Sequence, residues 1–355
     1  MNCCINCFKD RELRSIITSY NNVGNCDFCG EENALVYDVC CTPNPIADGL
    51  VGIISVYDVS VHEDAKPLKN ALYDDWDIFA GGSETILLLV KKLCLLSYPE
   101  DSDIFSHNVA ITRLSNEDYL RQLAIVGGKT WQEFSEYIKY KNRFHASMFN
   151  AEVFEKYLES AEKEYSKGTT MYRARIAPAE SGFSTKEMNA PPPEKRTSGR
   201  VNPEGIGVLY LSHDIKTVFH EARASTHDFV SVGRFCLKRN IRIVNLTEIS
   251  EVSPFLFSED LEQYAANRKV FQEIASEIAK PLRRSDSPLE YLPTQFITEF
   301  IKSKGYDGVE FASTLRKGGY NLAIFDETVF DCTEVQTVEV SKVEYNTLPT
   351  LWLEA

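Results

Sequence analysis

Apolar positions in the first part of the chain recur mainly with the period of a helix. Leu13, Ile16 and Ile17 are spaced i, i+3, i+4, which predicts a short amphipathic helix over residues 10–20. The same period predicts further helices over residues 83–94, 131–140 and 151–165. Gly168 follows the last of these, and glycine commonly ends a helix. The pattern therefore predicts a mostly helical region that ends near residue 165.

The rest of the chain mixes the two periods. Short apolar and β-branched runs predict strands at residues 171–176, 208–212, 230–237, 242–246, 308–312, 321–326 and 335–345. Helical spacing returns at residues 217–225, 261–279 and 294–304. The proline run from Pro191 to Pro193 predicts an irregular loop. Because strands and helices mix without a steady βαβ rhythm, the fold class predicted here is α+β.

Length and composition indicate a globular protein of several domains. A chain of 355 residues is long enough for two or three domains of ~100–200 residues. We place them at residues 1–45, 46–165 and 166–355. The hydrophobic fraction of 43% and the charged fraction of 25% are ordinary for soluble proteins. No apolar run reaches the ~18–20 residues that span a bilayer, so no membrane partner is expected.

Charge and cysteine content narrow the function further. The net charge of −14 opposes binding to nucleic acid, which relies on basic surface. An anionic small molecule would therefore need its own cluster of arginines. The first twenty residues are polar and cysteine-rich, unlike a signal peptide. With ten cysteines and no export signal, we expect a reducing cytoplasm.

Four cysteines near the N-terminus form two matched pairs. Cys4 and Cys7 make the first pair, and Cys26 and Cys29 the second, in a C-x2-C-x18-C-x2-C pattern. This spacing is typical of a zinc ribbon, in which each pair supplies two thiolates to one tetrahedral ion. A site with four thiolates is coordinatively closed, so the zinc would stabilise the fold of residues 1–45 and not catalyse.

Two alternatives to this zinc site remain open from the sequence. Cys3 adjoins Cys4 and could replace it as a ligand, and the cluster could also be a chance group of free cysteines. Cys40 and Cys41 are further candidates, but their spacing supports no specific role.

Short polar and aromatic motifs follow one another in the last domain. They are Tyr172-Arg173-Ala174-Arg175, Gly199-Arg200-Val201-Asn202-Pro203-Glu204-Gly205, Leu209-Tyr210-Leu211-Ser212, Phe219-His220-Glu221-Ala222, Asp307-Gly308-Val309-Glu310-Phe311-Ala312-Ser313 and Tyr320-Asn321-Leu322-Ala323-Ile324-Phe325. Their order and spacing resemble the RES domain over about residues 169–330. The segment from Cys4 to Gly30 resembles the zinc-containing, HEPN-like domain that precedes RES domains in longer bacterial members.

The resemblance implies both a fold and an activity. RES domains are toxins of bacterial toxin–antitoxin pairs that degrade NAD+, and their fold is similar to that of ADP-ribosyltransferases, with a cleft in a split β-core. The implied catalytic residues are Glu221, Arg173 and Tyr210. The implied NAD+-binding residues are Arg173, Arg200, Tyr210, Ser313 and Asn202. An antitoxin or regulatory protein is the implied partner, and a homo-oligomer is left open.

The chemistry of these residue types agrees with that reading. Cleavage of the nicotinamide–ribose bond develops positive charge on the ribose, which a carboxylate such as Glu221 would stabilise. Guanidinium groups match phosphate geometry, so Arg173 and Arg200 could hold the pyrophosphate. The ring of Tyr210 could stack on nicotinamide, and Ser313 could donate a hydrogen bond to a phosphate or ribose oxygen.

Each of these residues also has an ordinary structural interpretation. Glu221 on a helix could be a solvated surface charge, and Tyr210 in a strand could be a core residue. Ser313 could be an ordinary polar residue of a loop. Arg173 could pair with Asp307 or Glu310. Arg175 lies on the same face as Arg173 by strand alternation, so either arginine could be the ligand.

Two functions of different classes follow from the sequence. The first is an NAD+ glycohydrolase that depletes the cofactor as a toxin or defence effector, with transfer of ADP-ribose to protein or phosphate as variants of the same cleavage. The second is a catalytically inactive zinc-ribbon protein that senses or recruits a partner. No R-x(4–6)-H ribonuclease element occurs in the chain, so we interpret the middle region as a regulatory or scaffolding module.

Overall fold

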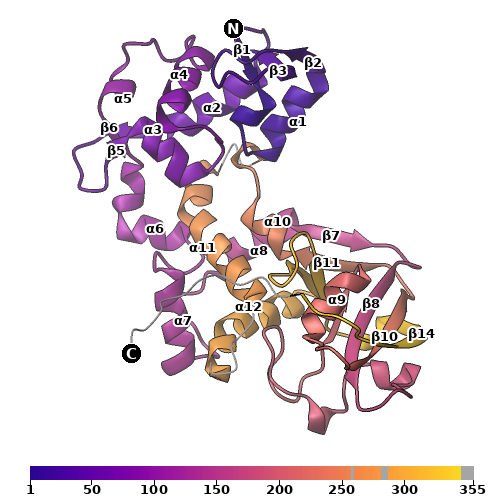
Figure 1. The fold of residues 1–355 in the computed structure, drawn as a ribbon. Coiled ribbons are helices and arrows are strands. Elements are labelled where there is room, and N and C mark those ends of the chain that lie inside the picture. The colour runs from indigo at the N-terminus through magenta and orange to yellow at the C-terminus, as the bar shows by residue number, and fades with distance from the viewer. Residues whose placement is uncertain (257–259, 281–286, 345–355) are drawn as a thin grey trace, which may run out of the picture. The chain divides into compact units, whose positions relative to one another are not determined.

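The computed structural model describes residues 1–256, 260–280 and 287–344 (Figure 1). The chain divides into two compact units. Unit 1 comprises residues 1–134, 146–157 and 250–273, and unit 2 comprises residues 135–145, 158–249 and 274–355. Four helices contain a boundary between the units: α7 (Trp131–Tyr140), α8 (Ala151–Ser160), α10 (Leu246–Ser250) and α11 (Leu261–Ala279). Helices and a large mixed sheet confirm the α+β class.

Unit 1 begins with a small antiparallel sheet that carries the cysteine pairs. Its strands lie in the order β1 (Asn2–Cys4), β3 (Ala34–Asp38) and β2 (Asn22–Gly24). The turn η1 (Ile5–Cys7) and helix α1 (Arg11–Tyr20) connect β1 to β2. Helix α1 confirms the prediction for residues 10–20. The side chain of Asp10 caps this helix by accepting from the N–H of Leu13 at 3.0 Å, and Leu13 and Ile17 are buried.

The remainder of unit 1 consists of short helices and one further small sheet. The helical segments are α2 (Pro45–Ser55), α3 (Leu68–Ala71), η2 (Leu72–Trp76), α4 (Ser83–Leu93), α5 (Asp103–Ser106), η3 (Thr112–Ser115), α6 (Glu117–Leu123) and η6 (Pro254–Leu256). The strands lie in the order β4 (Asp58–Val59), β6 (Asn108–Ala110) and β5 (Lys66–Pro67). On α4, Ile86, Leu89, Val90 and Leu93 are buried, with the spacing that the helical period predicts for one face.

Unit 2 contains an eight-stranded sheet. The strands lie in the order β14 (Phe330–Glu339), β10 (Phe229–Leu237), β8 (Thr170–Ala177), β9 (Leu209–Ser212), β13 (Tyr320–Ile324), β12 (Gly308–Ala312), β11 (Ile241–Asn245) and β7 (Glu162–Tyr165). Strands β11 and β12 are parallel, and the other neighbouring pairs are antiparallel. One face covers a core that includes Met171, Leu211 and Phe235.

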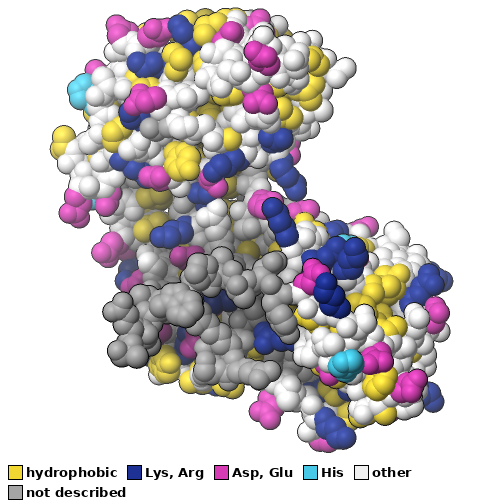
Figure 2. Space-filling view, viewed as in Figure 1, with side chains coloured by type: hydrophobic (Ala, Val, Ile, Leu, Met, Phe, Trp, Pro, Cys, Tyr) yellow, Lys and Arg dark blue, Asp and Glu magenta, His cyan; other side chains and the backbone are white. Residues whose placement is uncertain are grey.

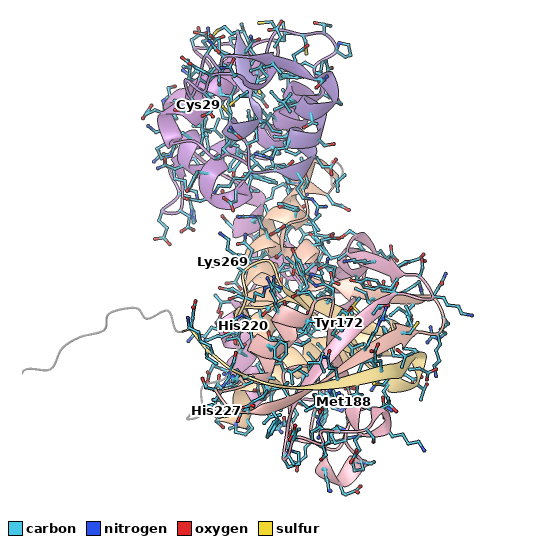
Figure 3. All side chains as sticks on the ribbon, turned by 45° about the vertical axis from the view of Figure 1, so that its right-hand side comes forward. Cys29, Tyr172, Met188, His220, His227 and Lys269 are labelled. Carbon is cyan, nitrogen blue, oxygen red and sulfur yellow. The ribbon has the colours of Figure 1, made fainter. Side chains whose placement is uncertain are left out.

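The sheet is nearly divided between β8 and β9. These two strands pair at a single position, Tyr172 opposite Ser212, whereas β8 pairs with β10 along its whole length. Figure 3 labels Tyr172 at this junction. Beyond it the facing edges of β8 and β9 diverge, so the sheet consists of two halves joined at one point.

The helices of unit 2 lie around this junction. Helix α9 (Ile215–Ala222) packs against β8 and β9, and α12 (Leu292–Ser303) packs against β12 (Figure 1). The shorter helical segments are η4 (Thr185–Met188), η5 (Pro193–Lys195), α10 (Leu246–Ser250), η7 (Pro288–Tyr291) and η8 (Glu327–Val329). The proline run therefore leads into a short 3₁₀ turn at Pro193, a modest departure from the irregular loop that was predicted.

Two predicted elements were wrong in extent. The helix predicted over residues 151–165 ends at Ser160, and Glu162–Tyr165 form the edge strand β7. Pairing with β11, some eighty residues away in sequence, overrides the local helical pattern there. The last strand begins at Phe330 and ends at Glu339, not at 335 and 345. Residue 345 lies outside the described residues.

The surface of one face and the apolar character of the helices can both be described. On the face drawn in Figure 2, acidic and basic side chains are interspersed among polar ones. Within residues 1–256, 260–280 and 287–344, no helix combines the length and the apolar character needed to cross a membrane.

Candidate active site and zinc centre

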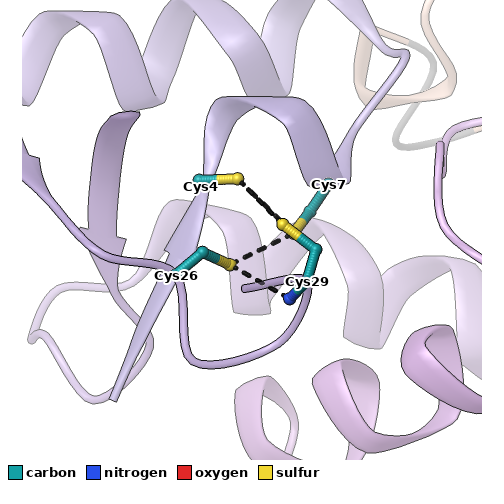
Figure 4. A group of neighbouring side chains, drawn as sticks. All are labelled: Cys4, Cys7, Cys26 and Cys29. Atoms are coloured by element: carbon teal, nitrogen blue, oxygen red, sulfur yellow. Dashed lines mark hydrogen bonds between the residues drawn. The ribbon is translucent and has the colours of Figure 1, made fainter. Parts of the chain in front are cut away.

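The four paired cysteines converge in unit 1 (Figure 4). Their Sγ atoms all lie within 4.8 Å of one another. The individual separations are 3.8 Å from Cys4 to Cys7, 3.4 Å from Cys4 to Cys29 and 3.6 Å from Cys7 to Cys26. Thiolates at ~2.3 Å from a tetrahedral zinc ion are ~3.8 Å apart, so the group fits this metal.

The backbone around the second pair is arranged to receive negative sulfur. The N–H groups of Phe28 and Cys29 both donate to Sγ of Cys26 at 3.4 Å. Burial alone would raise the pKa of Cys26, but these donors outweigh it and lower the pKa to about 7. Burial instead raises the pKa of Cys4 to about 11. The four cysteine sulfurs are therefore a ligand set that a zinc ion would bind as thiolates.

The other nearby cysteines have different partners. Sγ of Cys3 donates to the carbonyl of Tyr37 at 3.7 Å, and Sγ of Cys41 donates to the hydroxyl of Tyr37 at 2.9 Å. Cys40 is exposed. Among the described residues, the group with metal-site geometry contains Cys4 and not Cys3.

A second candidate site lies in unit 2, where the sheet divides. A cavity of about 360 Å³ is lined by residues of β8, β9, α9, β13 and the segment 197–202. Five residues singled out in the sequence line it: Arg173, Arg200, Asn202, Tyr210 and Glu221. Arg173 and Tyr210 come from the two strands that diverge at the junction, so the split of the sheet forms part of the cavity wall.

Glu221 is fixed by two neutral donors. Its Oε1 atom accepts from the hydroxyl of Ser313 at 2.6 Å and from Nδ2 of Asn321 at 2.7 Å. Both donors are almost completely buried, with exposed fractions of 7% each. Ser313 thus reaches the site through Glu221. Neutral donors hold a carboxylate in place without cancelling its charge, so the charge remains available to a ligand.

The two arginines of β8 have different environments. Arg173 lines the cavity, and within the described parts of the chain its buried Nη1 atom has no hydrogen-bond partner. Burial and then the nearby charge of Arg175 lower the pKa of Arg173 to about 10, so it is still charged at neutral pH. Arg175 donates to the carbonyl of Glu187 and lies over the ring of Phe183. The structure thus places Arg173, and not Arg175, in the cavity.

The acidic residues considered as partners of Arg173 bind elsewhere. Asp307 pairs with Arg239 at 2.6 Å. Glu310 is buried on β12 and accepts from Nζ of Lys163 at 2.7 Å and from the hydroxyl of Tyr165. A structural ion pair of Arg173 with either acid is therefore excluded.

Arg200 is anchored at a helix end. Its Nη1 atom donates to the carbonyls of Ile278 and Ala279, at 2.7 and 2.6 Å, which belong to the last turn of α11. A cation suits this position because the C-terminal end of a helix is partially negative. Its guanidinium also lies 6.0 Å from the ring centre of Phe311. Burial lowers the pKa of Arg200, and the nearby Glu221 opposes this effect.

Tyr210 and Asn202 form a linked pair. The Tyr210 hydroxyl donates to Oδ1 of Asn202 at 2.9 Å, and burial raises the pKa of Tyr210 to about 12. Nδ2 of Asn202 lies 3.0–3.2 Å from the carbonyls of Thr197, Pro203 and Ile206. A Cβ on Gly199 would lie 2.7 Å from Oδ1 of Asn202 and 2.9 Å from the Tyr210 hydroxyl. Only glycine leaves room for this arrangement.

Sequence reasoning missed Asn321 as a site residue. It was noted within a motif, but its contact with Glu221 crosses one hundred residues of sequence, and a strand asparagine carries no local signal. His220, labelled in Figure 3, is next to Glu221 in sequence but does not line this cavity.

The match to a family model supports the sequence resemblance. The RES domain profile matches residues 170–347, which is half of the chain. A chain of the crystal structure of the M. tuberculosis MbcT–MbcA toxin–antitoxin complex is similar at 12% identity, covering 52% of this chain and 91% of that one, with a TM-score of 0.31. We draw nothing further from a likeness at that level. No curated protein matches the chain. On the match over residues 170–347, the chain belongs to the RES domain family.

Proposed function

We propose that this protein is an NAD+ glycohydrolase that depletes NAD+ as a bacterial toxin or defence effector. One observation carries the proposal: the cavity is lined by a carboxylate and two guanidinium groups, and no direct ion pair joins them within the described residues. Glu221 is held by neutral donors, Arg173 has an unpartnered Nη1 among the described residues, and Arg200 binds backbone carbonyls. A ligand with a developing cation at one end and phosphates at the other fits these charges.

The proposed reaction breaks one bond and forms one. The bond between ribose C1′ and the nicotinamide nitrogen breaks, and its electron pair stays on nicotinamide, which leaves as a neutral molecule. A water oxygen then bonds to C1′, giving ADP-ribose and releasing one proton to solvent. Glu221 stabilises the positive charge that the ribose carries between these events. No strong general acid is needed because the leaving group begins as a cation.

Other residues of the cavity would bind and orient the substrate. Arg173 and Arg200 would hold the pyrophosphate, since guanidinium groups bind phosphate oxygens in a planar fork. The ring of Tyr210 would pack against nicotinamide. Asn202 would act mainly through Tyr210 and the neighbouring loop, because its amide is hydrogen-bonded within that segment. Ser313 would orient Glu221.

The remaining parts of the chain have supporting roles in this proposal. Zinc on Cys4, Cys7, Cys26 and Cys29 would be structural, since four thiolates leave no open position for a substrate. An antitoxin or another regulatory protein would control the activity, as in toxin–antitoxin pairs of the family. Water, phosphate and a protein side chain are all chemically competent acceptors for the ADP-ribosyl group.

The decisive experiment is to incubate the purified full chain with NAD+ and to measure free nicotinamide by chromatography. Parallel reactions with and without inorganic phosphate, followed by mass spectrometry, identify the acceptor. Glu334→Gln changes an exposed glutamate of β14 and is the matched control for Glu221→Gln. Nicotinamide release by wild type and the control, but not by Glu221→Gln, is the expected result. No release by wild type would favour the inactive interaction module.

A further inference from the structure

The segment that carries Arg200 is bound to helix α12 through its main chain. The carbonyls of four successive residues, 199 to 202, all accept hydrogen bonds from side chains of this helix. The donors are Gln295 to Gly199 at 2.7 Å, Thr294 to Arg200 at 2.8 Å, Thr298 to Val201 at 3.1 Å, and Gln295 to Asn202 at 2.9 Å. Gln295 also donates to the hydroxyl of Ser198 at 2.9 Å.

These donors form a polar stripe on an otherwise amphipathic helix. Thr294, Gln295 and Thr298 are exposed by only 2%, 5% and 0%, and their spacing places them on neighbouring positions of one face. Burying a polar side chain costs free energy unless its hydrogen bonds are made. The segment 198–202 supplies the acceptors, so the helix and the segment each satisfy groups that the other leaves unpaired.

Gln295 is the member of the stripe whose donor group serves the segment alone. The Thr298 hydroxyl has one proton and also lies within 3.1 Å of the carbonyls of Thr294 and Gln295. The Thr294 hydroxyl is likewise shared with the carbonyl of Tyr291 at 2.9 Å. The amide nitrogen of Gln295 has two protons, and its three acceptors all belong to residues 198–202. It is therefore the principal tie.

The hydrogen bonds of Gln295 hold two residues that line the cavity, Arg200 and Asn202. Arg200 lies in the middle of the segment and lines the cavity. Asn202 at its end accepts from the hydroxyl of Tyr210, another lining residue. In addition, the N–H of Gly199 donates to the carbonyl of Asn202 at 2.8 Å, which closes the segment into a tight turn. A shift of this turn would displace the main chain of Arg200 and disturb the hydrogen bond between Asn202 and the Tyr210 hydroxyl.

We propose that Gln295 is a positioning residue for substrate phosphate: by holding the main chain of residues 198–202 on α12, it places Arg200 and, through Asn202, Tyr210. The proposal rests on the proposed function for the identity of the substrate, but not for the mechanical link. Gln295 does not line the cavity, so it acts through the segment and not on the substrate.

The test compares Gln295→Met with Gln336→Met in the full chain. Methionine has nearly the size of glutamine but no donor, whereas Gln336 is an exposed residue of β14 away from the cavity lining. Removing the hydrogen bonds that the Gln295 amide donates to residues 198–202 should weaken NAD+ binding and raise KM by roughly tenfold or more, with a much smaller change in kcat. A role in fold stability alone would lower Tm and the active fraction and leave KM unchanged.

Thr298→Val and Thr298→Ser provide a second, independent pair should Gln295→Met fold poorly. The valine is isosteric and removes the hydroxyl, and serine restores it. We expect a smaller rise in KM for the valine variant and recovery in the serine variant. Wild-type KM in both Gln295→Met and Thr298→Val, with NAD+ turnover intact, would refute the positioning role and leave the proposed function standing.

Inorganic pyrophosphate separates failure of the inference from failure of the proposed function. If wild type neither binds nor cleaves NAD+, the proposed function fails, and pyrophosphate binding by calorimetry still measures the arginine site. Weaker pyrophosphate binding in Gln295→Met than in Gln336→Met would then support the tie. Equal binding in the two variants, or none in wild type, would overturn it.

Discussion

The cysteine cluster of unit 1 and the cavity of unit 2 differ in how their polar groups are bound. In the cluster, the Sγ atoms of four cysteines lie within 4.8 Å of one another, and a single metal ion could bind all of them. In the cavity, neutral donors bind Glu221, and Nη1 of Arg173 has no hydrogen-bond partner among the described residues. A site that one metal completes is closed and holds a fold together, whereas a site whose charges stay unpaired is open to a ligand. The contrast separates structure from chemistry within one chain.

The two regions also differ in how far apart their residues lie in sequence. All four cysteines fall between residues 4 and 29, and two short turns bring them together. The cavity draws on residues from 173 to 321, so it exists only when the eight-stranded sheet has formed. Damage to the first region should therefore stay local, while the second depends on the whole of unit 2.

The largest effect is expected when the cysteine cluster loses its metal ion or one of its cysteines. Removal of zinc by a strong chelator, or the substitution Cys4→Ser, should unfold the region around the two cysteine pairs, because structural zinc contributes on the order of 10 kcal/mol to small sites. Elemental analysis should show about one zinc ion per chain in wild type and less in the variant. Hydrogen exchange should reveal the loss of protection over residues 2–38.

Cys40→Ser is the matched control, since Cys40 is exposed and outside the cluster. It should keep both the metal and the protection. Nicotinamide release per folded unit 2 should change little in either variant. Metal-free protein with full protection of residues 2–38 would contradict the structural zinc site, and abolished chemistry in a folded Cys4→Ser protein would contradict the separation of roles.

The second effect, in order of size, concerns the carboxylate of the cavity. Glu221→Gln keeps the size of the side chain and its two donors but removes the negative charge. The rate of NAD+ cleavage should fall by roughly 10²–10³, because a charge aimed at a developing ion contributes ~3–4 kcal/mol to the barrier. NAD+ affinity should change much less. Single-turnover nicotinamide release together with calorimetric binding measures both, and wild-type turnover in this variant would make the glutamate structural.

Arg173 should behave differently because its Nη1 atom is buried without a hydrogen-bond partner among the described residues. Arg173→Met should weaken NAD+ binding by roughly 10- to 100-fold, as expected when a charged hydrogen bond to phosphate is lost. The same substitution should raise the free energy of unfolding by about 1–3 kcal/mol, because it removes a charge whose burial is costly enough to lower its pKa. Arg175→Met, on the same strand but outside the cavity, should leave binding near wild type. Loss of stability in Arg173→Met would show that the arginine has a structural partner.

The sequence predicts those features of the two regions that depend on residues close together in the chain. The cysteine spacing places its ligands within two turns, and Asp10 before an apolar stripe marks the start of α1. The edge strand β7 escaped because Glu162–Tyr165 continue a helical composition, and only distant pairing with β11 makes them a strand. The difference between Arg173 and Arg175 also escaped, since alternation gives both the same face.

The polar contacts that shape the cavity are harder still to read from sequence. Gln295, Thr294 and Thr298 look like the solvent face of an amphipathic helix, yet all three are buried against a segment nearly one hundred residues earlier. Asn321 likewise gives no local sign of its bond to Glu221. Such residues are identified by their hydrogen-bond partners, which are set by the tertiary fold and not by the pattern of neighbours.

The smallest effects should come from the donors that hold Glu221, and their combination tests the open character of the cavity most sharply. Ser313→Ala and Asn321→Ala each remove one of two bonds to the same oxygen, so each should lower turnover by about tenfold at most, since the other donor still orients the carboxylate. The double variant should lose more than the product of the two single effects, because nothing then restrains Glu221. A double-mutant cycle on single-turnover rates measures this coupling directly. Strictly additive losses would mean that the two donors act on the substrate separately, and that Glu221 is positioned by its own helix.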